Sequence, residues 1–338
     1  MTSSVSGYGS VLILLSGLLA AGPAAAESAK LTVQLWGSTW QSALEEISKR
    51  FEEKTGIKVE PVTQSSSGEG LVKLQAMKDD PTVDVWFTTS SVAARAATDE
   101  ALFAKIPKAG LPNVEALHEN AHTDDWVAAY YYPMGIIYRA DEVKTPITGW
   151  EDLWKPEFEG KLAVPSIGIY QGSMLLVASE LNGGSIDNVD PGFEALEKLR
   201  PNVSVYYGSD AQARQVVAQG EASVLVGQPS HAKRLRDEGI DVKMISPKPA
   251  PMLFDVMMIV KSGNEENAAK FIDFVSTPEM QELISLKTGM APVNPAAKPS
   301  PELVDSLPKP GDGVSFDDAK LNANIAAWTE RFNRDIAR

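Results

Sequence analysis

Apolar and polar side chains alternate in several short segments, and stretches with helical spacing lie between them. Residues 31–36 (LTVQLW) show the period of two that is typical of a β-strand. Leu44, Ile47 and Phe51 then recur on one helix face, and Gly56 ends that helix. Further strands are predicted at residues 57–62, 83–87, 162–165, 222–226 and 242–245. Further helices are predicted at residues 70–78, 172–181, 191–199, 211–219, 231–238, 264–276, 279–286 and 321–338. This order of elements predicts an α/β protein with parallel sheets.

The chain opens on a short apolar segment, residues 11–21, followed by Ala24-Ala25-Ala26. Such a run is too short to span a bilayer, and the A-x-A pattern is typical of a cleavage site. We therefore predict a secretory signal peptide over residues 1–26, cleaved near Ala26, and a periplasmic mature chain. The segment departs from the usual pattern in one respect, because no Lys or Arg precedes Val11.

Charge and composition narrow the classes of partner. The chain has 338 residues, with 45 acidic and 31 basic side chains and a formal net charge of −14. Nucleic acids and anionic lipids both require a basic face, so neither is expected as a partner. The absence of cysteine excludes disulfides, thiol catalysis and Cys-based metal sites. After residue 26 no apolar stretch approaches the roughly 18 residues of a membrane span, so no insertion into the membrane is expected.

Sequence motifs of catalysis are missing. The chain has no G-x-S-x-G, no Walker loop and no G-x-G-x-x-G after a predicted strand. His118 and His122 have the spacing of two ligands on one helix face, but they lack the Glu of an H-E-x-x-H zinc site. We therefore predict that the protein is not an enzyme and holds no metal or cofactor.

Four segments occur in a fixed order along the chain. They are FEEKTGIKV at residues 51–59, SGEGLVKL at 67–74 with PTVDVW at 81–86, GWEDLWKPEFEGK at 149–161, and FDVMMIVK at 254–261 with AAKFIDF at 268–274. Together these segments resemble the type II periplasmic binding proteins, in the branch that binds polyamines, iron(III), thiamine and 2-aminoethylphosphonate. The resemblance covers nearly the whole mature chain.

The resemblance implies a two-lobed type II periplasmic-binding-protein fold, with two hinge strands and a ligand cleft between the lobes. The expected parts are lobe 1 at residues 27–132 and 256–300, lobe 2 at 133–255, and a C-terminal segment and helix at 301–338 that packs on the lobes. The chain would cross to lobe 2 near residues 132–138 and return near 255–260. A ligand that contacts both lobes would favour the closed form.

Candidate ligand-binding residues come from strand ends, where α/β proteins place their ligands. Trp36 matches an aromatic residue of the polyamine-binding branch, whose ring face attracts an ammonium group, although a core role is the alternative. Asp255 matches a carboxylate of that branch that pairs with a ligand amine. The other candidates lie in loops after predicted strands or near the first crossing: Ser66, Ser91, Tyr132, Ser166, Tyr170, Tyr207 and Gln228. Ser66 and Ser91 either bind an anionic group of the ligand or only cap helices.

This chain departs from the polyamine pattern, because residues 166–170 replace acidic residues, and Gly227 and Leu253 replace tryptophans. It also lacks the adjacent tyrosines that the iron(III) pattern has after the strand at 222–226. The resemblance implies a monomeric solute-binding protein of an ABC transporter that delivers a small cationic or zwitterionic, polyamine-like solute to a permease and its ATPase. The alternatives are the same role for 2-aminoethylphosphonate, thiamine or iron(III), a sensory binding protein, and a secreted hydrolase.

Overall fold

The computed structural model describes residues 1–4, 29–107, 109–309 and 311–337. The predicted signal segment and its cleavage site fall on residues 5–28 and lie outside the described residues. Within the described ranges, no helix combines the length and the apolar character that a membrane crossing requires. The described strands form two sheets, one of seven strands and one of five, and thereby confirm the predicted two-lobed α/β fold.

The first sheet combines strands from the N-terminal third with one long strand from the C-terminal third. Strand β1 (Lys30–Trp36) lies parallel to β2 (Lys58–Gln64) and to β3 (Val85–Thr89), as the alternation of strands and helices predicts. Strand β11 (Ala250–Val260) runs antiparallel to β3. The short or edge strands of this sheet, all paired with β11, are β4 (Phe103–Ala104), β5 (Val127–Pro133) and β12 (Gly313–Val314).

Amphipathic helices cover the first sheet. Helix α1 (Gly37–Thr55) buries Leu44, Ile47 and Phe51, and it ends at Gly56 in the left-handed conformation that glycine adopts without strain. The other helices of this lobe are α2 (Ser67–Ala76), α3 (Ser90–Ala96), α4 (Pro112–Glu115), α9 (Glu265–Val275) and α10 (Pro278–Thr288). The predicted helices of this part therefore appear within a few residues of their expected bounds.

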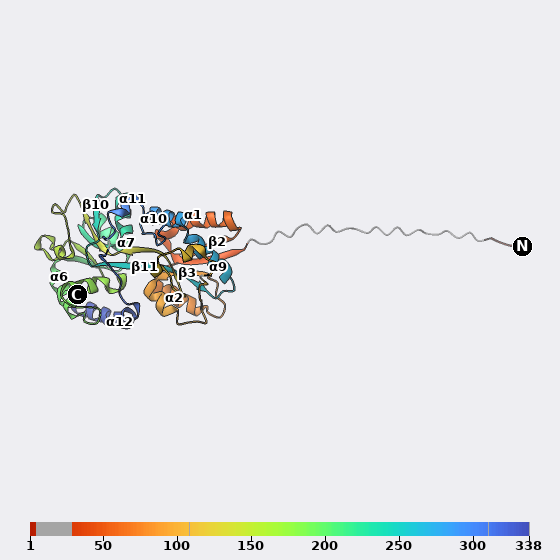
Figure 1. Ribbon diagram of the computed structural model, residues 1–338, viewed down its shortest axis with the longest axis horizontal. Coiled ribbons are helices and arrows are strands. Elements are labelled where there is room, and N and C mark those ends of the chain that lie inside the picture. Colours follow the sequence, from red (N-terminus) through yellow and green to blue (C-terminus); the bar gives the residue numbers. More distant parts are fainter. Residues whose placement is uncertain (5–28, 108, 310, 338) are drawn as a thin grey trace.

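The second sheet lies within the middle of the chain. Its strands, in spatial order, are β10 (Val242–Ile245), β6 (Gly135–Arg139), β9 (Val224–Gly227), β7 (Leu162–Pro165) and β8 (Val203–Tyr207). Strand β7 is parallel to both β8 and β9. The helices of this lobe are α5 (Ser173–Leu181), α6 (Asp190–Leu199), α7 (Asp210–Ala218) and α8 (Pro229–Asp237). Figure 1 shows the elements of the two sheets side by side, with β11 between them.

Two short crossings join the sheets. The chain leaves the first sheet after Pro133 and enters the second at Gly135, within the region predicted for the first crossing. It leaves the second sheet after Ile245, and β11 already pairs with β5 from Met252 onward. The return therefore precedes residues 255–260, where it was predicted, and residues 250–255 lie in the first sheet instead of in lobe 2. In the sequence only the apolar end of β11, at residues 257–260, stands out as a strand. The predicted return therefore lies later in the chain than the start of β11 at Ala250.

The C-terminal helix touches both lobes. Helix α12 (Asp318–Asp335) packs on α3 of the first lobe and on the 3₁₀ turn at Ile169–Gly172 of the second. Asn322 donates a hydrogen bond from Nδ2 to the Ser91 carbonyl oxygen at 2.8 Å. At the other end of the helix, the Phe332 ring meets Tyr206 edge-on at a centroid distance of 5.1 Å. The end of the chain therefore forms a third link between the lobes.

Candidate functional site

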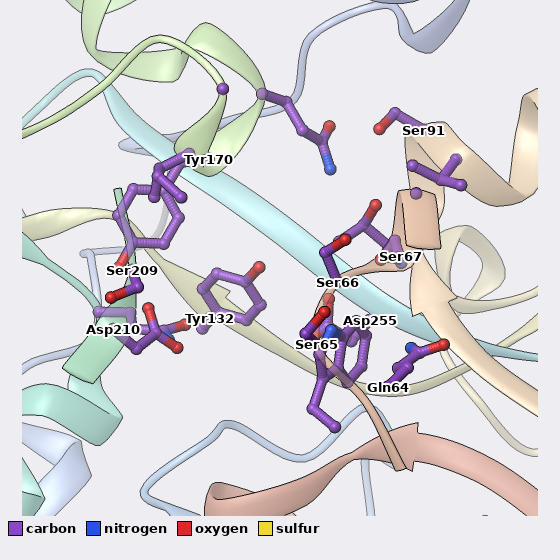
Figure 2. Close-up of a pocket in the computed structure, with 18 of the residues that line it drawn as sticks. Gln64, Ser65, Ser66, Ser67, Ser91, Tyr132, Tyr170, Ser209, Asp210 and Asp255 are labelled. Carbon is purple, nitrogen blue, oxygen red and sulfur yellow. Dashed lines mark hydrogen bonds between the residues drawn. The ribbon is translucent and has the colours of Figure 1, made fainter. Parts of the chain in front are cut away.

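A cavity of about 670 Å³ lies between the two sheets. Its walls come from the carboxyl ends of the parallel strands β1, β2 and β3 on one side and of β7, β8 and β9 on the other, the edge at which α/β sheets place ligands. Strands β5 and β11 cross its floor, and α12 adds Leu321, Asn322 and Ile325. In Figure 2, Tyr170, Ser209 and Asp210 of the second lobe face the serine-rich loop of the first lobe across this space.

Asp255 is the buried carboxylate of this cavity. Only 7% of the residue is exposed. The strand register shifts between Asp255 and Val256, and such a bulge changes the direction in which a side chain leaves the strand. The Tyr130 hydroxyl donates to Asp255 Oδ2 and itself accepts a hydrogen bond from Trp40 Nε1 at 2.8 Å. Asp255 Oδ1 is buried without a hydrogen-bond partner, so one acceptor remains free for a ligand.

The environment of Asp255 disfavours its negative charge. Burial raises the pKa of Asp255 from its usual 3.8 to about 7. The hydrogen bond from Tyr130 and the nearby Tyr132 hydroxyl lower the pKa of Asp255, and the nearby negative charge of Asp210 raises it further. A ligand cation placed at Oδ1 would reverse this balance, because an opposite charge at short range stabilises the ionised carboxylate.

Aromatic side chains surround this carboxylate. Trp36 lies at the end of β1, and Trp40, Tyr130, Tyr132 and Tyr170 also line the cavity. The Tyr132 ring lies 6.2 Å from the Tyr130 ring and 6.3 Å from the Tyr170 ring, centroid to centroid. Aromatic faces attract cations, and they exclude water from a buried carboxylate. This wall therefore suits an ammonium group with an apolar stem.

The serine-rich loop after β2 is fixed by hydrogen bonds that the chain makes with itself. Ser66 caps α2 by accepting a hydrogen bond from the Glu69 backbone N–H at 3.2 Å. The Ser67 hydroxyl oxygen accepts one from the Thr89 N–H at 3.3 Å. Gln64 anchors the loop, because its Nε2 donates to the Phe87 carbonyl and its Oε1 accepts from Trp86 Nε1, both at 2.8 Å. The loop is therefore held in place before any ligand arrives.

Asp210 is the second acidic side chain of the cavity, and polar side chains of the protein contact both of its carboxylate oxygens. It begins α7, half-buried, with Oδ1 3.1 Å from His231 Nε2 and Oδ2 accepting from Gln228 Nε2 at 3.3 Å. Burial acts to raise the pKa of Asp210, but the contact with His231 and the charge of Arg214 outweigh it and hold that pKa below 3.8. Asp210 is therefore a less available partner for a ligand cation than Asp255.

Two arginines and one strained turn complete the site. Arg95 and Arg214 line the cavity, and neither forms an ion pair within 4 Å among the described residues. Tyr170 and Gln171 follow each other with φ angles of 51° and 57°, a conformation that costs roughly 1–3 kcal/mol for a residue other than glycine. Gln171 Nε2 is buried without a hydrogen-bond partner. The cavity therefore offers donors for an anionic group as well as a buried carboxylate.

Most of the residues predicted to bind ligand line this cavity, namely Trp36, Ser66, Ser91, Tyr132, Tyr170, Gln228 and Asp255. Ser166 and Tyr207 are not among its lining residues. Tyr207 is completely buried, and its hydroxyl donates to the Val226 carbonyl at 2.6 Å, so its side chain belongs to the core of the second lobe. Ser166 lies in the loop before the strained turn, and its backbone N–H donates to the Tyr207 carbonyl.

Sequence reasoning missed several lining residues. Asp210 follows Ser209, which caps α7 just after β8, so the strand-end argument that selected the other candidates would have found it. Arg95 and Arg214 lie on helices that carry no distinctive motif. Asn322 and Ile325 reach the cavity only because α12 folds back across both lobes. No local pattern in the sequence indicates that contact.

Comparisons with known proteins point in one direction. The family model for the bacterial extracellular solute-binding proteins matches residues 46–309. Over the full length of both chains, the protein is 27% identical to the gamma-aminobutyric acid-binding protein of Pseudomonas aeruginosa. It is 26% identical to the spermidine/putrescine-binding periplasmic protein of Salmonella typhimurium, over 87% of each chain. A solved ABC transporter structure from Clostridium perfringens matches at 25% identity with a TM-score of 0.75, covering 90% of this chain and 99% of its own.

Proposed function

The chain belongs to the bacterial extracellular solute-binding proteins that serve ABC transporters, and from this premise we propose that its cleft captures a small amine-bearing solute. This family consists of transport binding proteins and not of enzymes, as the missing catalytic motifs predict. The observation that carries the proposal is Asp255, a buried carboxylate with one unpartnered oxygen inside an aromatic-walled cavity. The relatives named for spermidine/putrescine and for gamma-aminobutyric acid support an amine as the recognised group.

Asp255 selects for a cation because leaving its oxygen unpaired is costly. A buried acceptor without a partner loses about 1–3 kcal/mol, and more when it is charged. A primary ammonium group supplies both the donor and the opposite charge, and the rings of Trp36 and Tyr132 can surround its methylene stem. A neutral or anionic solute offers no such compensation at this position.

The rest of the cavity favours a zwitterion over a long polyamine. A diamine needs a second available carboxylate, but Asp210 is already paired with His231 and Gln228. Arg95 and Arg214 instead offer positive charge to an anionic end. We therefore place a small ω-amino acid ahead of putrescine and spermidine, with 2-aminoethylphosphonate compatible for the same reason. Iron(III) finds less support, since the cavity wall contains no pair of tyrosinate ligands after β9.

The role in transport follows from closure of the lobes. A ligand that touches Asp255 on β11 and the loops of the second lobe stabilises the closed form by its differential affinity for that form. In this proposal the closed protein then docks, as a periplasmic monomer, on a permease that a cytoplasmic ATPase drives.

A thermal-shift panel tests the proposal. It contains 4-aminobutyrate, putrescine, 2-aminoethylphosphonate and butyrate, the last being 4-aminobutyrate without its amine. A ligand at 100 times its dissociation constant stabilises the folded protein by about 2.7 kcal/mol, which is readily measured. We expect stabilisation by 4-aminobutyrate and none by butyrate. Equal stabilisation by these two solutes would refute recognition of the amine.

A pair of matched variants locates the effect. Asp255→Asn removes the charge and keeps the shape, so the affinity for an amine ligand should fall by about 2–5 kcal/mol, or roughly 30-fold or more. Asp79→Asn makes the same chemical change at an exposed position outside the cavity and should leave affinity unchanged. If both variants bind 4-aminobutyrate like the unmodified protein, Asp255 does not contact the ligand.

A further inference from the structure

A second, smaller cavity of about 190 Å³ lies beside the main one. Gln171 and Leu321 line both cavities and form the wall between them. The second cavity opens at the junction of the lobes, because it is bounded by Ser90 of α3, by Phe254 of β11 and by residues of the C-terminal segment. Neither the match to the solute-binding family nor the proposed ligand site assigns it a role.

Asp318 is the one charged side chain among the described residues that line this cavity. It is half-buried, and no Lys, Arg or His lies within ion-pairing distance of it in the described part of the chain. Burial raises the pKa of Asp318 to about 6, the Ser90 hydroxyl lowers it by donating a hydrogen bond, and the charge of Asp317 raises it. The carboxylate therefore lacks a counter-ion from the protein.

Helix capping does not account for the orientation of Asp318. The N-cap of α12 is Asp317, whose Oδ1 accepts from the Lys320 backbone N–H at 2.9 Å. An acidic residue in the first turn gains only about 0.3–1 kcal/mol from the helix dipole, and an exposed carboxylate obtains that benefit as well. Turning Asp318 toward a cavity brings a desolvation cost that the helix alone does not require.

The remaining walls are the kind that recognise organic cations. Trp126, Phe254 and Phe316 line the cavity together with Asp318, so three aromatic rings accompany one carboxylate. Aromatic faces attract ammonium groups, and Ser90 and Asn120 add neutral polar groups. A volume of 190 Å³ is about six times the roughly 30 Å³ that one water occupies in the liquid, so a cation of a few heavy atoms fits.

We propose that this cavity is a second ligand site, which binds a small alkylammonium ion between Asp318 and the rings of Trp126, Phe254 and Phe316. The site is separate from the one at Asp255. Asp255 lines only the first cavity, whereas Asp318 and the three aromatic side chains line only the second. Because the second cavity joins elements of both lobes, an occupant would also favour the closed form.

The two cavities can be observed separately through their tryptophans. The chain has seven, of which Trp126 lines the second cavity while Trp36 and Trp40 line the first. The protein labelled with 5-fluorotryptophan is titrated with ethylammonium chloride and followed by ¹⁹F NMR, with signals assigned by Trp→Phe variants. We expect the Trp126 signal to move saturably with ethylammonium and not with sodium chloride at the same ionic strength.

Three variants decide the outcome. Asp318→Asn should raise the ethylammonium concentration at half saturation of the Trp126 shift about tenfold. Asp79→Asn is the matched control, since it makes the same chemical change at an exposed position outside both cavities, and it should leave that shift unchanged. Asp255→Asn should also leave it unchanged. A Trp126 shift that disappears in Asp255→Asn, that sodium reproduces, or that survives Asp318→Asn unaltered would overturn the second site. None of these outcomes would refute binding of 4-aminobutyrate at Asp255.

Discussion

Replacing Asp255 by asparagine should make the ligand-free protein more stable at neutral and alkaline pH while it weakens ligand binding. The pKa of Asp255 is about 7 in the folded chain, against its usual 3.8. Between these two values the folded protein holds a proton that the unfolded chain has released. Its free energy of unfolding therefore falls as the pH rises, by about 1.4 kcal/mol per pH unit.

The magnitude follows from the width of this pH window. From 3.8 to about 7 the accumulated loss is about 4 kcal/mol, and it is complete by about pH 8. Asparagine cannot ionise, so the variant escapes this loss. Any pH-independent effect of the substitution, such as an amide donor left without a partner, shifts the difference between the two proteins by a constant. The change of that difference with pH isolates the charge of Asp255.

Urea unfolding of both proteins without ligand, at several values between pH 4 and pH 8, measures the effect. We expect the stability of the variant relative to the unmodified protein to grow by about 4 kcal/mol across this range. Asp79→Asn, an exposed control, should show no such growth. The error of such unfolding measurements is about 1 kcal/mol. If the difference in stability between the variant and the unmodified protein changes by no more than about 1 kcal/mol from pH 4 to pH 8, Asp255 is not a desolvated carboxylate.

Further predictions concern other parts of the cleft. Affinity for an amine ligand should fall about tenfold per pH unit below pH 7, because binding then displaces the proton of Asp255, and calorimetry at pH 5.5–8 checks this. The double variant Arg95→Gln, Arg214→Gln should weaken the binding of 4-aminobutyrate but not the binding of putrescine, and one series of calorimetric titrations measures both affinities. Gly70→Ala should destabilise the protein by about 1–3 kcal/mol in urea unfolding, because a Cβ there would lie 1.9 Å from Gln64 Oε1.

The sequence predicts the fold well because the sheets are built from local patterns. The alternation in β1, the helix face of Leu44, Ile47 and Phe51, and the stop at Gly56 are each encoded within a few neighbouring residues. Pairing with β5 and β12, and not the local pattern, decides that β11 begins at Ala250, which is earlier than the return predicted near residues 255–260.

The candidate site is less accessible from sequence because its properties arise between elements. The strand-end argument selected Trp36, and the family resemblance selected Asp255, and both line the cavity. The strand-end argument also selected Tyr207, whose side chain turns into the core toward β9. Nothing local to Asp255 reveals that one of its oxygens lacks a partner, nor that Asp210 is paired with His231. These contacts join residues that are 18 or more positions apart in the sequence, and only the folded chain brings such residues together.

Helix α12 has a consequence for how this protein can diversify. It carries Asn322 and Ile325 into the wall of the cleft, yet it belongs to neither sheet. Recombination that exchanges the codons of α12 between paralogous genes would therefore replace part of the binding surface and leave both sheets intact. An affinity tag inserted directly after α12 adjoins the same element, so binding data from such fusions need comparison with protein tagged elsewhere.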